Sequence, residues 1–430
     1  MDTTTAISPK DKFIKNLSAL PFAEEQVYTA NIRKEAQDAY NALDFPTLRN
    51  EDWKYTKVTG IIKNEFQSQS TDLKIDIKPF LLEGAEENTL VFVNGYFRKD
   101  LSVIASSEKL IVENIADAAL KHKELFNTYF ARFANFKENI FTALNTAFYT
   151  GGTFIHIADK AVIEKPIHIL HLNKGDNVIS QPRNLFVSGK SSQAKIICTY
   201  ETLDSNLAFT NVITEVFLKE NAHLSIDKLQ NENIETSHIS TEQVYQEADS
   251  NFTINTITMN GALVRNNLNI VVDAENCESN LNGLYLPEGK QHVDNHTLVD
   301  HRKPHCQSNE LYKGVMNGQS TAVFNGKVFV RQDAQKTNAF QSNKNILLSD
   351  DATINSKPEL EIYADDVKCS HGSTTGQMDE ESVFYLRSRG IGKENAVNLL
   401  MNAFVSDVIN KIKTESFKQK VEQLLEQKIK

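Results

Sequence analysis

The chain of 430 residues has only four cysteines, nine prolines and one tryptophan, and it contains no long apolar run. Cys198, Cys277, Cys306 and Cys369 are scattered and form no Cys-x-x-Cys pair, so we expect reduced thiols rather than a disulfide framework. No window approaches the roughly 20 apolar residues that a membrane span requires. The first residues, Met-Asp-Thr-Thr-Thr-Ala-Ile, lack the features of a signal peptide, so we predict a cytoplasmic protein without a membrane partner.

Basic patches and common catalytic motifs are missing as well. The formal net charge is -10 and no stripe of clustered Lys and Arg stands out, which argues against a nucleic-acid partner. The segment from Gly283 to Lys290 has one residue too many for a phosphate-binding loop, and Gln291 follows it instead of Ser or Thr. We therefore expect no nucleotide to be bound by this chain. Neither a Gly-x-Ser-x-Gly elbow nor a His-Glu-x-x-His pair occurs.

The first 150 residues mix helical and strand-like patterns. Apolar residues recur at intervals of three and four from Asp11 to Ala42, with Pro21 between two segments, which predicts two helices. A turn carrying Trp53 and Tyr55 follows, and we expect both rings to pack inward. Further on, one strand is expected over Thr89–Val93 and helices over Ile111–Ala119 and Leu125–Phe136. Residues 1–150 therefore form a predicted helical and α/β region.

From Gly151 the pattern changes to apolar alternation with a period of two, which is typical of strands. The first predicted strands are Thr153–Ile157, Ile167–Leu172, Asn184–Val187 and Ala194–Tyr200. Similar segments recur later, anchored on Ala222, Ala248, Ala274, Ala322 and Ala352, at about one or two multiples of a coil of roughly 25 residues. This weak repeat predicts a mainly β protein with a parallel β-helix over residues 151–375. A β-sandwich is the competing fold.

After residue 375 the period becomes helical. The glycines at 372 and 376 are expected to end the last strand, and Asp379 followed by Glu380 and Glu381 is typical of a capped helix start. Apolar spacing predicts three helices, the first ending near Gly390. Residues 376–430 therefore form a predicted C-terminal helical domain.

Cys369 and His371 form the first candidate site. They stand two residues apart, so on a strand both side chains leave the same face. Thiolate and imidazole suit iron-sulfur chemistry, but two ligands cannot complete the shell of a cluster. If the site is real, a second chain is the simplest source of the others. The alternative is a buried cysteine beside a hydrogen-bonded histidine at a strand end.

A second candidate lies on the segment before Cys306. His292, Asp294 and His296 would project from one face of a strand, and two imidazoles with a carboxylate can bind a transition metal. The alternative is an exposed face whose polar side chains hydrogen-bond to one another. A self-contained metal-binding protein therefore remains open. So does a β-helix enzyme acting on polysaccharides, with an acid/base pair among the many Asp and Glu residues.

The stretch from Cys369 to Ile391 resembles the signature of the SufB/SufD family, the scaffold proteins of the Suf iron-sulfur cluster assembly machinery. The segments Leu48–Thr56 and Val299–Gly314 resemble the SufD branch of that family. The resemblance implies a right-handed parallel β-helix core between helical N-terminal and C-terminal parts. It also implies a non-catalytic scaffold that pairs with SufB through the β-helix and assembles with two copies of the ATPase SufC.

The resemblance further assigns roles to particular residues. His371 matches the position that faces SufB and contributes to a nascent, transient cluster shared between the two chains, while the role of Cys369 is left open. The start of the helical tail resembles the docking surface for SufC, with Tyr385, Leu386, Arg387, Arg389, Gly390 and Ile391. For the two arginines, capping of the helix end is the alternative. Flavin has been linked to the family, but no flavin-phosphate motif occurs here, and a homodimer of the isolated chain is also considered.

Overall fold

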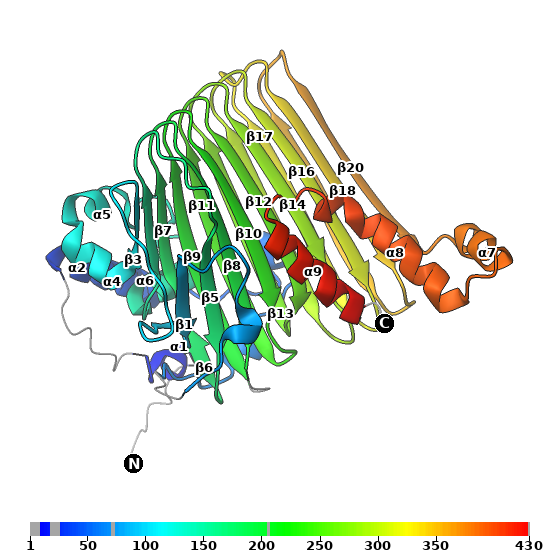
Figure 1. Cartoon of the computed structure of the whole chain (residues 1–430), viewed down its shortest axis with the longest axis horizontal. Helices are drawn as coiled ribbons and strands as arrows, with labels where there is room; N and C mark the ends of the chain where they lie inside the picture. Colours follow the sequence, from blue (N-terminus) through cyan, green and yellow to red (C-terminus); the bar gives the residue numbers. More distant parts are fainter. Residues whose placement is uncertain (1–8, 18–25, 70–73, 204–206, 429–430) are drawn as a thin grey trace.

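The computed structural model describes residues 9–17, 26–69, 74–203 and 207–428. Two large, mainly parallel sheets face one another and form a β-helix, with helices at its N-terminal end and a helical segment across one face (Figure 1). The predicted mainly β fold with a parallel β-helix core between helical termini is confirmed, and the β-sandwich is wrong. Within the described ranges, no helix is long and apolar enough to cross a membrane.

The first sheet ends at β20, and we call it the β20 sheet. Its strands, in spatial order, are β2 (Tyr96–Phe97), β1 (Thr89–Val93), β5 (Ile167–Asn173), β8 (Gln193–Thr202), β10 (His223–Asn231), β12 (Asn251–Asn260), β14 (Glu278–Tyr285), β16 (Gln307–Met316), β18 (Asn338–Leu347) and β20 (Lys368–Gln377). All neighbours pair in parallel except β1 and β2.

The second sheet ends at β19, and we call it the β19 sheet. Its strands, in spatial order, are β19 (Thr353–Ile362), β17 (Thr321–Val330), β15 (His292–His301), β13 (Leu263–Val272), β11 (Thr236–Gln246), β9 (Ala208–Leu218), β7 (Arg183–Ser188), β4 (Thr153–Ile157) and β3 (Leu110–Asn114), with β6 (Val178–Ser180) also on β9. Only β3 and β4 pair antiparallel. Because β1 and β3 join these sheets, the N-terminal region contributes strands to the solenoid.

The helices lie at the two ends of the chain. They are α1 (Pro9–Ile14), α2 (Val27–Ala42), α3 (Thr59–Ile62), α4 (Ile115–Lys121), α5 (Lys123–Tyr129), α6 (Ile140–Phe148), α7 (Glu380–Ser388), α8 (Lys393–Ile409) and α9 (Glu415–Lys428), with short 3-10 turns η1 (Glu51–Trp53) and η2 (Lys78–Phe80). The three C-terminal helices match the prediction. Asp379 accepts hydrogen bonds from the backbone of Glu381 and Ser382, as expected of a capping residue.

One coil of the solenoid is longer than predicted. Hydrogen bonds between equivalent side chains of neighbouring coils span 27 residues in one place and 31 in another, against the expected 25. The reason is the length of the strands, most of which have about ten residues. Ala222, Ala248 and Ala274 mark the same corner of successive coils, whereas Ala322 and Ala352 precede or begin strands of the other sheet. The interval between the two groups therefore crosses from one sheet to the other.

Four local predictions are wrong. Strand β20 continues through Gly372 and Gly376, because its pairing with β18 supplies backbone hydrogen bonds along its whole length. Trp53 is buried as expected, but Tyr55 is 43% exposed. The predicted helix from Ile111 begins only at Ile115, since the preceding residues form β3 against β4. The helix predicted over Leu125–Phe136 ends at Tyr129, because the backbone N–H groups of Ala131 and Phe133 donate to Glu215 instead of continuing the helix. The proposed break at Pro21 lies outside the described residues.

The space between the sheets holds both apolar and polar side chains, and its hydrophobic core extends from the first coils to Phe324 and Ala352 near the last. Early coils contribute side chains such as Ile169 and Ile196 to a hydrophobic core. In later coils Lys228 and Glu242 form an ion pair of 2.8 Å with side chains only 2% and 5% exposed. Other buried polar side chains follow toward the last coil, including Asn266, Asn295, Glu310, Gln341 and Asn343.

The outer faces of the sheets are covered by different helices. The N-terminal helices, with α6, pack against the β19 sheet through a cluster that includes Tyr40, Phe141 and Phe209. Helices α8 and α9 cross the β20 sheet and bury Val405 and Phe417 against its strands (Figure 1). No coil follows β19 and β20 in the described chain, so this end of the solenoid is uncovered.

Candidate functional site

The uncovered end consists of two edge strands, β19 and β20, each of ten residues and each without a neighbouring strand on its outer side in the described chain. All but one of the residues of β20 are exposed, and those of β19 are exposed or half-buried, unlike any other strand of the central coils. The backbone of Lys368 donates to Thr337, so even-numbered residues of β20 face β18 and odd-numbered ones direct their backbone groups away from the solenoid. Unpaired edges of this length are templates for pairing with another chain.

His371 and Cys369 lie on this edge strand, on the row of side chains that faces the interior of the solenoid. Cys369 follows Ala339 and His371 follows Gln341 in the register with β18. His371 is exposed and has no hydrogen bond or ion pair within the described chain. Cys369 is half-buried and packs against a small cluster with Val328 and Ala339. Burial raises the pKa of the Cys369 thiol, which favours its neutral form.

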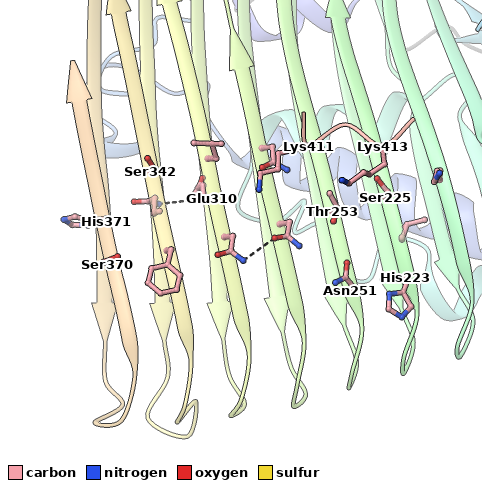
Figure 2. A pocket seen from close by; sticks show the side chains of 18 of the residues that line it. His223, Ser225, Asn251, Thr253, Glu310, Ser342, Ser370, His371, Lys411 and Lys413 are labelled. Carbon is pink, nitrogen blue, oxygen red and sulfur yellow. Dashed lines mark hydrogen bonds between the residues drawn. The ribbon is translucent and has the colours of Figure 1, made fainter. Parts of the chain in front are cut away.

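Two buried polar residues lie on the same row, one and two coils below His371. The amide nitrogen of Gln341 donates to Glu310 Oε2 at 2.7 Å, and Thr297 from the β19 sheet donates to Glu310 Oε1 at 2.6 Å. One of the dashed lines in Figure 2 marks this hydrogen bond at Glu310, and His371 is labelled on the outermost strand. Burial raises the pKa of Glu310 to about 7 despite these two donors.

The raised pKa predicts a loss of stability with rising pH. The neutral carboxyl stabilises the folded state fully below its usual pKa of 4.5, and this contribution disappears as the pH rises through about 7. The shift corresponds to about 3 kcal/mol in the free energy of unfolding. Glu310→Gln, which keeps the shape and cannot ionise, should therefore unfold at a higher urea concentration than the wild type at pH 8 but not at pH 5. Equal pH dependence of the two midpoints would contradict this.

A groove of about 930 Å³ runs across the outer face of the β20 sheet and reaches the candidate site. Small polar side chains line its floor, and Lys411 and Lys413, from the segment between α8 and α9, line its side. Figure 2 shows it extending from His223 on β10 to Ser370 and His371 on β20. The groove therefore opens at the same uncovered end of the solenoid.

His292, Asp294 and His296 do share one face of β15, as predicted, but they hold the N-terminal segment. Arg265 donates to Asp294 at 2.6 Å and lies 3.8 Å from the ring centre of Trp53, while Thr56 bonds to both His292 and Asp294. Burial alone would raise the pKa of Asp294, yet Arg265 and His296 hold it well below its usual value. The described residues contain no group of three or more His, Cys, Asp or Glu side chains arranged to hold a metal ion.

The predicted docking residues lie at the start of the C-terminal helices. Helix α7 buries none of its residues and projects from the solenoid beside β20 (Figure 1). Tyr385 is 57% exposed, and the Arg389 guanidinium lies 5.4 Å from its ring centre. Gly390 has φ of 88°, a left-handed conformation that ends the helix, and Ile391 donates back to Leu386. Leu386 and Ile391 are half-buried, whereas Arg387 and Arg389 are exposed.

Sequence reasoning did not identify Gln341 and Glu310 as neighbours of His371. Gln341 lies 30 residues before His371 and 31 residues after Glu310, which is one coil in each direction. It pairs in register with both residues. An accurate coil length was the signal that could have found them. The shorter predicted coil of 25 residues would have placed other residues beneath the site.

Comparison with known proteins agrees with this architecture. The family described as "SUF system FeS cluster assembly, SufBD core domain" matches residues 171–404, and the one described as "SufBD protein N-terminal region" matches residues 13–169. A SufBD family protein of Synechocystis, slr0076, is 31% identical over 433 residues, covering 97% of this chain and 95% of that protein. SufD of Escherichia coli is 29% identical over 386 residues, 87% of each chain, and SufD of Bacillus subtilis is 24% identical over 446 residues, 100% of each. This chain belongs to the SufBD family of iron-sulfur cluster assembly proteins.

Proposed function

We propose that this chain is a SufD-like, non-catalytic scaffold subunit that pairs with SufB, binds the ATPase SufC, and contributes His371 to a nascent cluster between the two scaffold chains. The observation that carries the proposal is the uncovered last coil, which presents two edge strands and His371 together. The named relatives that match over most of their length, two of them SufD, support the assignment to this branch.

The uncovered end fits a partner that continues the solenoid. A SufB chain with its own terminal strands could pair with the outward backbone groups of β19 and β20, which removes the cost of leaving long edges exposed. His371 would then lie between two chains rather than at a surface. This explains how one histidine can take part in a site that needs several ligands.

His371 suits a cluster that is assembled and then released. Iron and sulfide are the cargo here, and the imidazole of His371 is a weaker ligand for them than a thiolate, which favours later transfer to another protein. The raised pKa of Cys369 and its packing against Val328 make it a less ready ligand at neutral pH. We therefore give His371 the main role in this chain and Cys369 a secondary one.

The second partner would bind at the C-terminal helices. Phe384 and Tyr385 on α7 are 71% and 57% exposed, and aromatic and arginine side chains commonly dominate protein interfaces. Lys313 on β16 forms a 2.5 Å ion pair with Asp407 on α8, which ties these helices to the sheet. Movement of two ATPase subunits on α7 and α8 of the two scaffold chains would be transmitted to the β-helix and open the shared site to iron and sulfide.

The proposal predicts that the chain co-purifies with SufB and SufC and that His371→Ala removes most of the cluster formed by the purified complex. The loss is expected to be at least about tenfold in the absorbance of reconstituted cluster, because a missing ligand leaves the shell incomplete. His305, on a turn between β15 and β16, provides a matched control as His305→Ala. An unchanged yield with His371→Ala would remove His371 from the mechanism, and failure to bind SufB would remove the scaffold role.

A further inference from the structure

A buried polar atom without a partner lies one coil below His371. Gln341 is only 3% exposed and pairs in register with His371. Its Oε1 atom is fully covered, and no residue in the described ranges donates a hydrogen bond to it. An unsatisfied buried carbonyl oxygen costs about 1–3 kcal/mol, so its position calls for a donor.

The orientation of the Gln341 amide follows from its neighbours. Glu310 offers only acceptors when it is ionised, and both of its oxygens are engaged, Oε1 by Thr297 and Oε2 by the Gln341 nitrogen. Burial raises the pKa of Glu310 to about 7, so at pH 8 its carboxyl is mostly ionised and the amide nitrogen faces it, in the coil below. Because the two polar atoms of an amide diverge from one carbon, the oxygen faces away from Glu310.

In the strand register His371 pairs with Gln341 on the side opposite to Glu310, and its imidazole can donate a hydrogen bond. Adjacent strands are about 4.8 Å apart, so side chains on the same row of neighbouring coils can touch. His371 is exposed on an edge strand and makes no other hydrogen bond in the described chain, so its side chain can rotate toward Gln341. A histidine that binds a metal usually donates its second ring N–H to a carbonyl or carboxylate oxygen.

We propose that Gln341 is a positioning residue for His371: its Oε1 accepts the imidazole N–H, which fixes the tautomer and leaves the other ring nitrogen free to face the shared cluster site. The importance of this hydrogen bond for assembly rests on the proposed function of His371, but the bond itself does not. Thr297, Glu310 and Gln341 then form a continuous chain of hydrogen bonds from the opposite sheet to the edge strand.

Through this chain of hydrogen bonds, buried residues of the last coils would act on the imidazole of His371 at the uncovered end. Above pH 7 the ionised Glu310 carboxylate polarises the Gln341 amide, and a polarised carbonyl is a stronger acceptor for the imidazole N–H. The ring nitrogen opposite to that bond thereby becomes a better donor to iron. The last coils would thus prepare the ligand before a partner arrives.

The first test measures the tautomer of His371 in the isolated full-length chain. Ring nitrogen shifts of ¹⁵N-histidine at pH 8 distinguish the two neutral tautomers, and the signals missing from His371→Ala identify this residue. In the wild type we expect one tautomer to exceed the other by at least about tenfold, which corresponds to one hydrogen bond of about 1.4 kcal/mol. In Gln341→Met, which keeps the length of the side chain, the ratio should shift toward that of an unstructured histidine peptide.

Two further variants separate this effect from a general disturbance. In Glu310→Gln the new amide can donate to Gln341 Oε1, so the preference of His371 should also weaken although the fold is kept. Tyr285→Phe alters a different interior network, in which the Tyr285 hydroxyl donates to Asn345 at 2.6 Å, and should leave the tautomer ratio unchanged. The same ratio in the wild type and Gln341→Met would overturn the proposal.

The second test measures cluster yield on the purified complex with SufB and SufC. If Gln341→Met lowers the yield at least about threefold while Tyr285→Phe does not, positioning by Gln341 matters for assembly. If His371→Ala lowers the yield and Gln341→Met does not, the positioning role is wrong and the proposed function stands. If His371→Ala has no effect, the proposed function fails, and the tautomer measurement alone decides whether the hydrogen bond exists.

Discussion

Thr375→Pro is expected to leave the chain folded but to weaken its binding to SufB by about 10- to 100-fold. Thr375 has an odd number on β20, so its backbone N–H points away from β18 toward the uncovered end. Proline removes that donor, and its ring occupies the space of an approaching strand. A partner carbonyl left unpaired costs about 1–3 kcal/mol, which accounts for the expected loss of affinity.

The neighbouring residue supplies the control. Thr374 directs its backbone N–H toward β18, so Thr374→Pro breaks a bond inside the sheet and should lower the stability of the isolated chain. Binding to SufB is measured by titration calorimetry, and folding by circular dichroism and urea unfolding. Normal affinity of a folded Thr375→Pro chain would mean that the partner does not pair with β20 through its backbone, which contradicts the proposed interface.

The strands of the β-helix could be predicted because apolar residues recur along them with a period of about two, even in β5 and β7, where every residue is buried. This signal is local and does not depend on which strands are neighbours. The coil length could not be read in the same way, since Ala274 and Ala322 belong to different sheets. The continuation of β20 through Gly372 and Gly376 also depends on β18, about 30 residues earlier in the chain. Pairing supplied hydrogen bonds that outweighed the weak strand preference of glycine.

For the candidate sites, too, the local geometry could be predicted from the sequence and the long-range contacts could not. The common face of His292, Asp294 and His296 follows from strand geometry and was predicted. Their partners could not be, because Thr56 lies 236 residues before His292 in the sequence. A buried Arg265 beside Asp294 makes this face a structural contact, where a cation already occupies the place that a metal ion would need. Residues that act together across long separations become visible only when the register is known.

Glu215→Ala is expected to be the most destabilising single substitution among those considered, lowering the free energy of unfolding by about 3–5 kcal/mol or more. Glu215 on β9 and Arg183 on β7 form a 2.6 Å ion pair whose side chains are both 0% exposed. The Glu215 carboxylate also accepts hydrogen bonds from the backbone of Ala131, Phe133 and Ala134 at 2.8 to 3.1 Å. Removing the carboxylate leaves a buried guanidinium without its ion-pair partner and three backbone N–H groups without an acceptor.

The size of this loss matters because a folded domain is stable by only about 5–15 kcal/mol. Urea unfolding followed by circular dichroism gives the midpoint, and hydrogen exchange at Ala131 and Phe133 reports whether the segment after α5 detaches first. Glu220→Ala is the matched control, since its ion pair with Lys190 is about half exposed and solvent screens it. Similar midpoints for the two variants would show that the segment is held by its aromatic contacts instead. A lower midpoint for Glu215→Ala alone would show that the bonds from the backbone of Ala131, Phe133 and Ala134 to Glu215, together with its ion pair, hold the segment after α5 on β9.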